Sequence, residues 1–418
     1  MNNELTLDNL VAQGGPTCMV IKARLGPVGD QDRFQPAGFP EVGHVIYDAP
    51  RGKGQKEKVC IIDSAASMAN HLESVCIPDG TELHPDLLGL PYVLCVTGPK
   101  PEGDTEVLEV KLDSPNNKIV VTSLTEGHRI ASEYFVDKKG DRCFLNAVWV
   151  KDKEKTEKKG SKEDKTIIPA HWEGETFRDR LRREFGIIEV KKNAKYFVHP
   201  EDWWVIYKTI FKYDPNSLVH GILLATEQIK ISRLLTASLE AFGAARVGRS
   251  GVKFDRLGKT LSGQPIFAVD EETASEIRAT FILDLALLRS YGRNDKGLND
   301  HQKKLLLGLA LWKIKSLLAQ PFRYRSQCYL KCTAVEIVTE GNSQATSSAS
   351  QSQGNENVQP TESTLPPLLR DLQMSTLISA CNFEGVTKVY YPADKLFEEE
   401  ETASEGTPEV DEASNLEE

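Results

Sequence analysis

The longest regular pattern in the sequence is an apolar repeat at residues 301–319. Residues 301–320 read HQKKLLLGLALWKIKSLLAQ, and the leucines and tryptophan recur at three- and four-residue spacing until Pro321 ends the pattern. Strand-like segments flank it, at 279–290 on one side and 325–338 on the other. The sequence therefore predicts a strand–helix–strand unit in this region, and any fold for the chain has to include it.

Three further elements precede this unit. Residues 17–25 alternate apolar with polar or cationic side chains, which is typical of a half-buried strand. Residues 64–76 predict a helix with Asp63 or Ser64 as its N-cap. The apolar run 218–225 predicts a short strand, followed by a helical segment. The order is βαββαβ, so we predict an α+β fold of the ferredoxin-like plan, which RNA-recognition folds share.

Long insertions explain the length of the chain. We place them at about 80–212 and 227–278, inside a core that covers residues 1–338. Beyond the core we predict a low-complexity linker at 339–364, a small C-terminal module at 365–397 and a disordered acidic tail at 398–418.

Two charged segments lie in the first insertion. Residues 151–165 are rich in lysine and lack apolar side chains, which predicts a disordered cationic loop. Residues 177–185 (FRDRLRREF) predict a basic amphipathic helix.

The acidity of the chain is concentrated in its tail. The net charge is −10, but residues 398–418 hold ten acidic residues and no lysine or arginine. The remaining 397 residues therefore carry 51 acidic and 51 basic side chains (61 minus 10, against 51). A basic groove on one face of the body is compatible with this balance.

Cysteine usage and the N-terminus indicate a cytoplasmic protein. The eight cysteines are scattered without a CxxC pair, which is typical of reduced core residues, and Cys328 and Cys332 lack a nearby histidine for a metal site. The N-terminal segment MNNELTLDNL has no basic or apolar signal region, and no apolar run is long enough to span a membrane. We predict no metal, no cofactor and no membrane partner.

Motifs for catalysis are missing from the sequence. It contains no GxSxG, no HExxH and no GxxxxGK[ST] pattern. His128 and His220 lie among polar residues, where either a general base or a structural hydrogen-bonding role is open. Asp30 and Asp32 follow the first strand, where they serve either phosphodiester cleavage or a turn. We therefore predict that the chain is not an enzyme.

Cations gather in loops and at the ends of elements, most of them beside glycine or serine. They are Arg33, Arg129, Arg246, Arg249, Lys253, Arg256, Arg289 and Arg293. Residues 243–253 (GAARVGRSGVK) combine three of these cations with three glycines, which permit close approach of a ligand. Cations in such positions contact phosphates, so this pattern predicts a polyanion, and RNA in particular.

Four ordered blocks of the sequence resemble one CRISPR protein family. The blocks are RFQPAGFP at 33–40, DSAASMANHLE at 63–73, DPNSLVHG at 214–221 and GVKFDR at 251–256. They are similar to signature blocks of the RAMP-superfamily backbone subunit, the Cas-seven type or GSU0053-like family, of type I-G (formerly I-U) effector complexes. The resemblance runs from about residue 17 to 338.

This resemblance implies a modified RNA-recognition fold in a right-hand shape. Several copies would polymerise along a CRISPR RNA in a Cascade-like complex, hold its phosphates in a basic groove and present its bases to target DNA. Further effector subunits would complete the complex, and the family implies no catalysis by this subunit. An aromatic stacking motif of the RNP type is not recognisable, so tracking of the RNA backbone is preferred to base stacking on the sheet.

The expected RNA-binding residues come from two sources. By position in the blocks they are Arg33, Gln35, Ser67, Asn70, Asn216, His220, Lys253 and Arg256. On chemistry alone we add His128, Arg129, Arg246, Arg249 and Arg289.

Two other functions stay open at this level. One is an RNA endonuclease of the same superfamily that uses Asp30, Asp32 or His128. The other is a protein–protein interaction scaffold that binds no RNA.

Overall fold

The computed structural model describes residues 5–39, 43–80, 82–137, 142–159, 162–192, 195–200, 202–247, 271–340 and 365–396. The chain divides into two compact units and passes between them several times. Unit 1 comprises Met1–Tyr92, Ser123–Ile130 and Glu184–Val386, and unit 2 comprises Val93–Thr122, Ala131–Arg183 and Thr387–Glu418.

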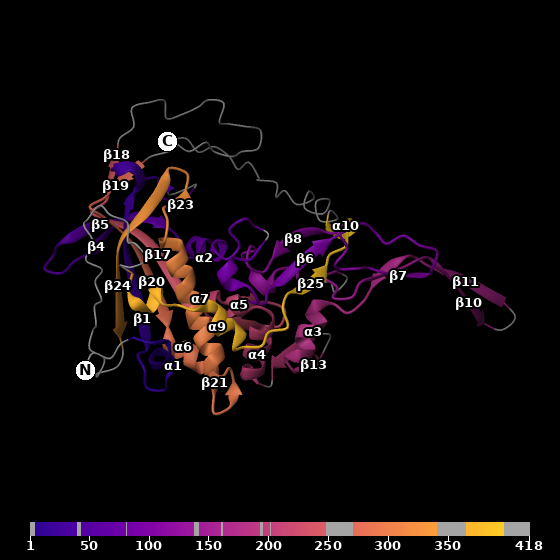
Figure 1. The fold of residues 1–418 in the computed structure, drawn as a ribbon. Helices are drawn as coiled ribbons and strands as arrows, with labels where there is room; N and C mark the ends of the chain where they lie inside the picture. The colour runs from indigo at the N-terminus through magenta and orange to yellow at the C-terminus, as the bar shows by residue number, and fades with distance from the viewer. Residues whose placement is uncertain are drawn as a thin grey trace, which may run out of the picture. The chain divides into compact units, whose positions relative to one another are not determined.

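Unit 1 is built on a seven-stranded antiparallel sheet with the order β23-β24-β1-β20-β17-β5-β4 (Figure 1). The strands are β1 (Cys18–Pro27), β4 (Ile46–Pro50), β5 (Lys56–Asp63), β17 (Leu235–Phe242), β20 (Glu276–Asp284), β23 (Phe322–Arg325) and β24 (Cys328–Glu340). Strand β1 lies between β24 and β20, and its alternation of buried and half-buried side chains confirms the predicted first strand.

The sheet is curled, because strands far apart in its order touch. Arg325 in β23, the first strand of the order, donates a hydrogen bond of 2.7 Å to Asp63 at the end of β5, the sixth strand. A flat sheet would hold these strands about 24 Å apart, at roughly 4.8 Å for each of five steps. Unit 1 is therefore a mixed α+β structure around a strongly curved antiparallel sheet.

Helices cover one face of this sheet (Figure 1). The central ones are α2 (Ala65–Ser74), α5 (Pro215–His220) and α7 (Asp300–Leu318), and α7 confirms the predicted helix at 301–319. A capping box of Asn299 and Gln302 starts α7. The other helices of unit 1 are α1 (Leu7–Val11), α4 (Trp203–Tyr213), α6 (Leu285–Ser290), α8 (Pro367–Arg370) and α9 (Met374–Ser379).

Short hairpins and single turns complete unit 1. The hairpins are β2 (Gly38–Phe39) with β3 (Gly43–His44), β13 (Ile187–Lys192) with β14 (Lys195–Pro200), β15 (Ile222–Leu224) with β16 (Ile229–Ile231), β18 (Ala245–Val247) with β19 (Glu271–Thr273), and β21 (Gly292–Arg293) with β22 (Lys296–Gly297). The 3-10 turns are η1 (Val28–Asp30), η2 (Pro85–Leu87) and η3 (Arg129–Ala131). Ala131, the last residue of η3, belongs to unit 2.

The second predicted strand is wrong. Residues 215–220 form α5, because Asp214 precedes Pro215 at the first helical position, where proline fits best. Only Ile222–Leu224 is extended, and it pairs with β16 outside the main sheet. The strand that joins the sheet is β17, in the region predicted as helix and then insertion. The predicted strand 279–290 is also too long, since Asp284 caps α6 and ends β20 there.

Unit 2 contains two three-stranded sheets. One has the order β25-β6-β8, from β25 (Thr387–Tyr390), β6 (Val93–Thr97) and β8 (Lys118–Thr122), and β25 runs parallel to β6. The other has the order β12-β9-β7, from β12 (His171–Glu173), β9 (Val148–Val150) and β7 (Val107–Glu109). Trp149 and Trp172 face each other across the second sheet with ring centroids 4.9 Å apart, and Trp172 packs on Tyr390 at 5.5 Å.

Two predictions about these regions need correction. The stretch 151–165 is not a loop, because β10 (Lys153–Lys159) and β11 (Lys162–Ile168) form an antiparallel hairpin at the outer end of unit 2 in Figure 1. The C-terminal segment is not a separate module, because 365–386 belongs to unit 1 and 387–396, with β25 and α10 (Ala393–Leu396), to unit 2. The basic helix is found as α3 (Phe177–Glu184).

Two further properties of the described residues bear on the sequence predictions. None of their helices is both long and apolar enough to cross a lipid bilayer. All eight cysteines have free thiols, and burial raises the pKa of the Cys60 thiol to about 12, so that it stays protonated and inert.

Candidate nucleic-acid interface

The loop that follows β1 forms the rim of the curled sheet. Its backbone pairs with three other segments: Gln35 donates to the carbonyl of Gln327 at 3.0 Å, Ala37 donates to Ile62 at 2.8 Å, and Phe34 exchanges two hydrogen bonds with Glu272. The Phe34 side chain is 1% exposed. This loop is therefore fixed to the core by its backbone and by Phe34.

An open hollow of about 490 Å³ lies on this rim, and we call it the rim groove. Its lining residues are Val28, Gln31, Arg33, Glu271, Gln327 and Tyr329. The Arg33 side chain is 52% exposed and lies 3.5 Å from Asp32 and 3.9 Å from Glu271, distances at which exposed ion pairs contribute little. A guanidinium in this position is free to take a stronger anionic partner.

An aromatic ring and a second arginine stand at the groove. Tyr329 is 49% exposed, and the Arg323 guanidinium lies 5.8 Å from the centre of its ring. Arg323 and Tyr329 face each other across the β23–β24 pair. An exposed ring beside a cation is the combination that stacks a base and holds a phosphate.

Arg246 reaches the same rim from β18. Its Nε donates to Glu272 at 3.1 Å, and His44 Nδ1 bonds the same carboxylate oxygen at 2.9 Å. Glu272 is fully buried, whereas the Arg246 side chain is 51% exposed. The buried Glu272 carboxylate therefore binds Nε of Arg246, while about half of the Arg246 side chain is exposed to solvent.

Helix α2 is anchored at its first turn by Asp63. This carboxylate accepts hydrogen bonds from the Ser64 amide (2.9 Å) and Ser67 Oγ (3.0 Å), bonds His71 Nε2 at 2.9 Å, and pairs with Arg325. Burial opposes ionisation of Asp63, but the bond to His71 and the charge of Arg325 outweigh it, so its pKa is lowered. Ser67 thus binds the first turn of α2 to Asp63, which in turn pairs with Arg325 of β23.

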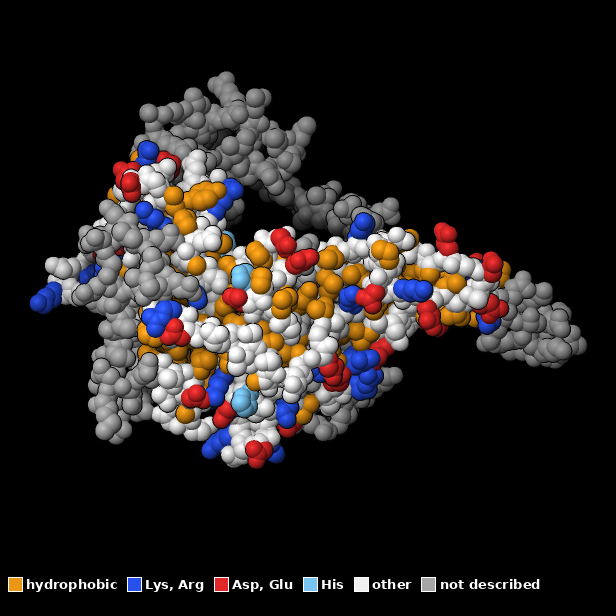
Figure 2. All heavy atoms as spheres, in the orientation of Figure 1, with side chains coloured by type: hydrophobic (Ala, Val, Ile, Leu, Met, Phe, Trp, Pro, Cys, Tyr) orange, Lys and Arg blue, Asp and Glu red, His pale blue; other side chains and the backbone are white. Residues whose placement is uncertain are grey.

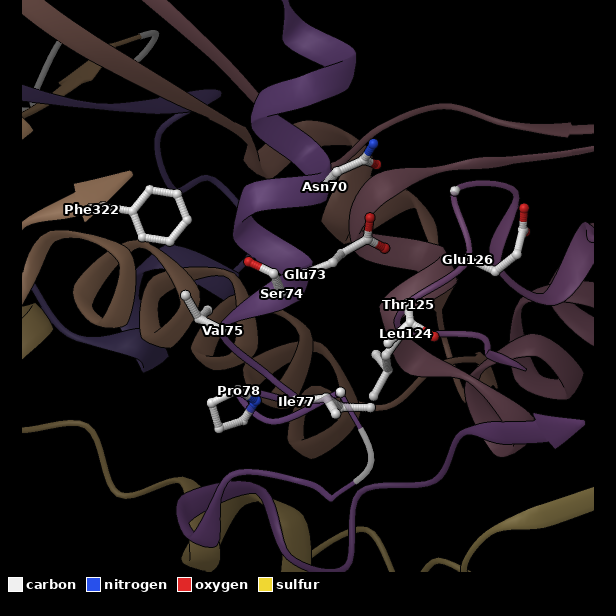
Figure 3. A pocket seen from close by; sticks show the side chains of 12 residues that line it. Asn70, Glu73, Ser74, Val75, Ile77, Pro78, Leu124, Thr125, Glu126 and Phe322 are labelled. Carbon is white, nitrogen blue, oxygen red and sulfur yellow. The ribbon is translucent and has the colours of Figure 1, made fainter. Parts of the chain in front are cut away.

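A second hollow, of about 470 Å³, runs along α2 (Figure 3). Asn70 and Ser74 line it from the helix, and Thr125 and Glu126 line it from the segment 123–130. Asn70 is exposed. At the same segment His128 is 82% exposed and bonds Glu126 through Nδ1 at 3.0 Å. The polar side chains therefore stand around a largely apolar floor.

Beneath this hollow lies a group of four buried polar residues, which we call the buried network. Glu73 accepts two hydrogen bonds from Arg129, of 2.6 and 2.7 Å, and one of 2.6 Å from Asn216 Nδ2. Asn216 in turn accepts from the ammonium of Lys313. All four side chains are at most 6% exposed, so α2, the segment 123–130, α5 and α7 are joined at one point.

Two titratable residues lie beside the buried network: Asp214, just before α5, and His220, the last residue of α5. Asp214 accepts from Ser217 at 2.7 Å, and burial raises the pKa of its carboxyl to about 6. His220 is 1% exposed, and neither ring nitrogen has a hydrogen-bond partner among the described residues. Burial lowers the pKa of His220 well below its usual value, and the positive charges of Lys313 and Arg129 lower it further, so the ring stays neutral.

The structure separates the predicted RNA-binding residues into groups. Those at the surface or partly exposed are Arg33, Gln35, Ser67, Asn70, His128 and Arg246. Those in the interior are Arg129, Asn216 and His220. Arg289 lies elsewhere and donates to the carbonyls of Leu10 and Pro16, which fixes the N-terminal segment. Arg249, Lys253 and Arg256 lie outside the described residues.

Sequence reasoning missed three residues of the rim: Arg323, Arg325 and Tyr329. The signal was present in the stretch FRYRSQCY, which alternates aromatic and cationic side chains, but it was used only to predict a strand. The β23–β24 turn lies beside the loop after β1 in the folded chain. The sequence alone does not show that these side chains are near that loop.

The residues considered for catalysis are dispersed in the structure. Asp30 and Asp32 are more than four-fifths exposed, and each lies near one cation, Lys331 or Arg33. Among the described residues no cluster of histidine, cysteine, aspartate and glutamate could hold a metal ion.

A family model matches more than half of the chain, from residue 19 to residue 246 of 418. Its description is "CRISPR-associated protein GSU0053", so the chain is a CRISPR-associated protein. Within that class it belongs to the GSU0053 family, the Cas-seven-type family that its motif blocks resemble. Three of the four blocks lie wholly inside the matched residues.

Among solved structures, one similar chain comes from a "CRISPR RNA-guided surveillance complex, pre-nicking". It is 13% identical to this chain, with a TM-score of 0.29, over 77% of this chain and 78% of that one. No curated protein matches the sequence.

Proposed function

We propose that this protein is a CRISPR RNA-binding backbone subunit of a type I-G interference complex. Several copies would line up along one guide RNA and present it to target DNA, beside other effector subunits. Family membership supports this function, and one structural observation carries it: the half-exposed Arg33 lines the rim groove with only weak carboxylate contacts, beside the exposed ring of Tyr329 and the Arg323 guanidinium.

The connections of the sheet support a ferredoxin-like core of the RNA-recognition type. Its four central strands lie in the order β24-β1-β20-β17, all antiparallel. Helix α2 lies in the connection from β1 to β17, and α7 lies in the connection from β20 to β24. This is the arrangement of a βαββαβ core, here extended by β5 and β4 at one edge and by β23 at the other.

RNA would be held by its backbone at the rim. Arg33, Arg246 and Arg323 supply guanidinium groups for phosphates, and Tyr329 supplies a ring for one base. Asn70 and His128 would line the path along α2, and Gln35 would contact RNA from the loop after β1. Ser67, which bonds Asp63, would hold α2 in place. Arg249, Lys253 and Arg256 follow Arg246 in the chain, and we keep them as expected phosphate contacts.

The interior residues have a different part in this proposal. Arg129, Asn216 and His220 are buried, and so would support α2 from below without touching RNA. Arg289 would hold the N-terminal segment in place. The predicted contacts therefore reduce to the exposed residues and those beyond Arg246.

The test is retention of small RNA by purified protein. Arg33→Glu/Arg323→Glu should lose bound RNA and reduce the salt-dependence slope of RNA affinity by about 1.4, about 0.7 for each of the two phosphate contacts removed from a single strand. The matched control is Lys53→Glu/Lys230→Glu, which reverses two exposed lysines on other hairpins of unit 1. Wild-type RNA retention by the rim variant would contradict the proposal.

The non-catalytic part of the proposal has its own test. Labelled RNA incubated with the protein and Mg²⁺ should stay intact, beside an Asp32→Ala control. Cleavage by the wild type that Asp32→Ala abolishes would favour the endonuclease.

A further inference from the structure

Two cations oppose each other on the hairpin β21–β22. Arg293 and Lys296 are directly paired across it, and the turn residues Asn294 and Asp295 have φ of 50° and 65°, as in a type I′ turn. Like charges directly opposite each other on a sheet are destabilising. Neither cation has an ion-pair partner among the described residues, although Asp295 lies in the turn between them.

Aromatic side chains of α4 lie beside this hairpin. Trp203 is 42% exposed, unusual for a side chain of this size, and its ring centroid lies 6.2 Å from that of Tyr207 one turn later. Trp204 packs on the hairpin, where its Nε1 donates to Ser290 at 3.2 Å and the Lys296 ammonium lies 5.8 Å from its ring. The exposed indole of Trp203 thus belongs to the helix that packs against this cationic hairpin.

The hairpin lies close to α4 because Gly292 and Gly297 have no side chains. Gly297 has a φ of +74°, and a Cβ there would lie 2.3 Å from the Tyr291 carbonyl oxygen and 2.8 Å from the Trp204 ring. A Cβ at Gly292 would lie 2.1 Å from the Leu298 carbonyl oxygen. Tyr291 is itself buried, and its hydroxyl donates to Leu218 at 3.2 Å. The backbone of the hairpin is therefore held close to Trp204 of α4.

This surface lies at the end of the sheet opposite the rim groove. At one end of β1, Cys18 pairs with Asp284, just before α6 and the hairpin. At the other end, Pro27 pairs with Leu330, beside the β23–β24 turn. In Figure 2, blue Lys and Arg side chains stand beside a red carboxylate at the lower end of unit 1, where Figure 1 draws β21.

We propose that Trp203, Arg293 and Lys296 form a second binding site, for single-stranded nucleic acid, separate from the rim groove. One base stacks on the exposed indole of Trp203, and the backbone phosphates that follow it lie on Arg293 and Lys296. Lys208, one turn after Trp204, extends the cationic edge. Asp202 does not oppose this, because its carboxylate caps α4 by accepting from the Trp204 amide at 2.8 Å.

The site is tested with a fluorescein-labelled oligothymidylate of about 15 nucleotides, added to protein as purified with any guide it carries. Trp203→Ala should weaken binding about 10-fold and remove the quenching of tryptophan fluorescence that base stacking causes. Arg293→Glu/Lys296→Glu should lower the salt slope by about 1.4, about 0.7 for each phosphate. Trp203→Phe should retain most of the affinity.

Matched variants separate this site from general effects. Tyr47→Ala removes an aromatic ring of similar exposure, and Lys53→Glu/Lys230→Glu reverses two lysines elsewhere; both should bind as the wild type. The measurement is repeated in Arg33→Glu/Arg323→Glu protein, so that failure of the rim groove and failure of this site are read separately.

Two results would overturn the proposal. One is oligonucleotide binding by Trp203→Ala and Arg293→Glu/Lys296→Glu that equals the wild type. The other is unchanged binding together with loss of self-association in sedimentation, which would identify the surface as a protein interface.

Discussion

The rim groove and the buried network contain similar side chains in opposite settings. At the rim, Arg33 is half exposed and its nearest carboxylates lie 3.5 Å away or more. In the buried network, Arg129 is 6% exposed and makes two short hydrogen bonds to Glu73. Both arginines were predicted to bind RNA from sequence. The comparison teaches that an arginine in a loop is either exposed and available to a ligand or buried as an anchor, and only its depth in the fold decides which.

The largest effect is expected from breaking the buried network. Glu73→Ala leaves the Arg129 guanidinium without its carboxylate and Asn216 Nδ2 without its acceptor in the interior, which should cost about 3–5 kcal/mol of unfolding free energy. Chemical denaturation measures it. Glu73→Gln, which keeps the shape and part of the hydrogen bonding, should cost less; equal losses from both variants would show that the charge is unimportant.

The next effect concerns the pH dependence of stability. Because burial raises the pKa of Asp214 from 3.8 to about 6, the folded protein holds this proton more tightly than the unfolded chain. The carboxyl therefore stabilises the fold fully below about pH 4, and this contribution is lost as the pH rises through 6. Asp214→Asn should remove that loss, with a gain relative to wild type of up to about 3 kcal/mol between pH 4 and pH 8.

Urea denaturation of the wild type and Asp214→Asn at pH 4, 6 and 8 provides the measurement. His220 acts in the opposite direction, because its lowered pKa makes the fold lose stability as the pH falls below about 6.5. It is present in both proteins, so their difference isolates Asp214. A difference independent of pH would contradict the predicted shift.

A smaller effect is expected at the first turn of α2. Ser64 accepts a hydrogen bond from the Ser67 amide at 3.2 Å, so Ser64→Ala should destabilise the protein by about 1 kcal/mol. Thermal unfolding measures this loss, and Ser64→Thr should restore most of it. Because α2 carries the exposed Asn70, which we propose as an RNA contact, weaker RNA retention is expected to accompany the change.

The smallest stability effect is expected at the exposed residues themselves. Arg33→Ala and Asn70→Ala should each change the unfolding free energy by less than about 0.5 kcal/mol, because neither side chain is buried. Their RNA retention should nevertheless fall. A large loss of stability in either variant would remove the distinction between the groove and the network.

Long, one-sided patterns were predictable from sequence, and short ones were not. The helix at 301–319 and the strand at 17–25 were found because their periodicity continues over many residues. Strand β17 was missed because LTASLEAF consists mainly of good helix formers, although its residues are buried alternately once they join the sheet. The charged hairpin β10–β11 was missed because it lacks the apolar face that marks a strand.

The sequence predicted several residues of the candidate site, but not where the fold places them. The motif blocks pointed to Arg33, Gln35, Ser67 and Asn70, and the structure places all four at or near the surface of unit 1. Burial of Asn216 and His220 could not be read from the blocks, because it depends on α5 packing against α7. Arg323 and Tyr329 entered only when the curl of the sheet brought β23 to the loop after β1.

The pairing of β25 with β6 has a consequence for how the chain is made. Val93 pairs with Thr387, so the central strand of that sheet in unit 2 leaves the ribosome long before its parallel neighbour does. Until β25 emerges, one edge of β6 has unpaired backbone groups, and edges of this kind attract other chains. Production of the protein truncated before Thr387 should therefore yield aggregates, and slow translation of the last third of the message should lower the yield of the intact chain.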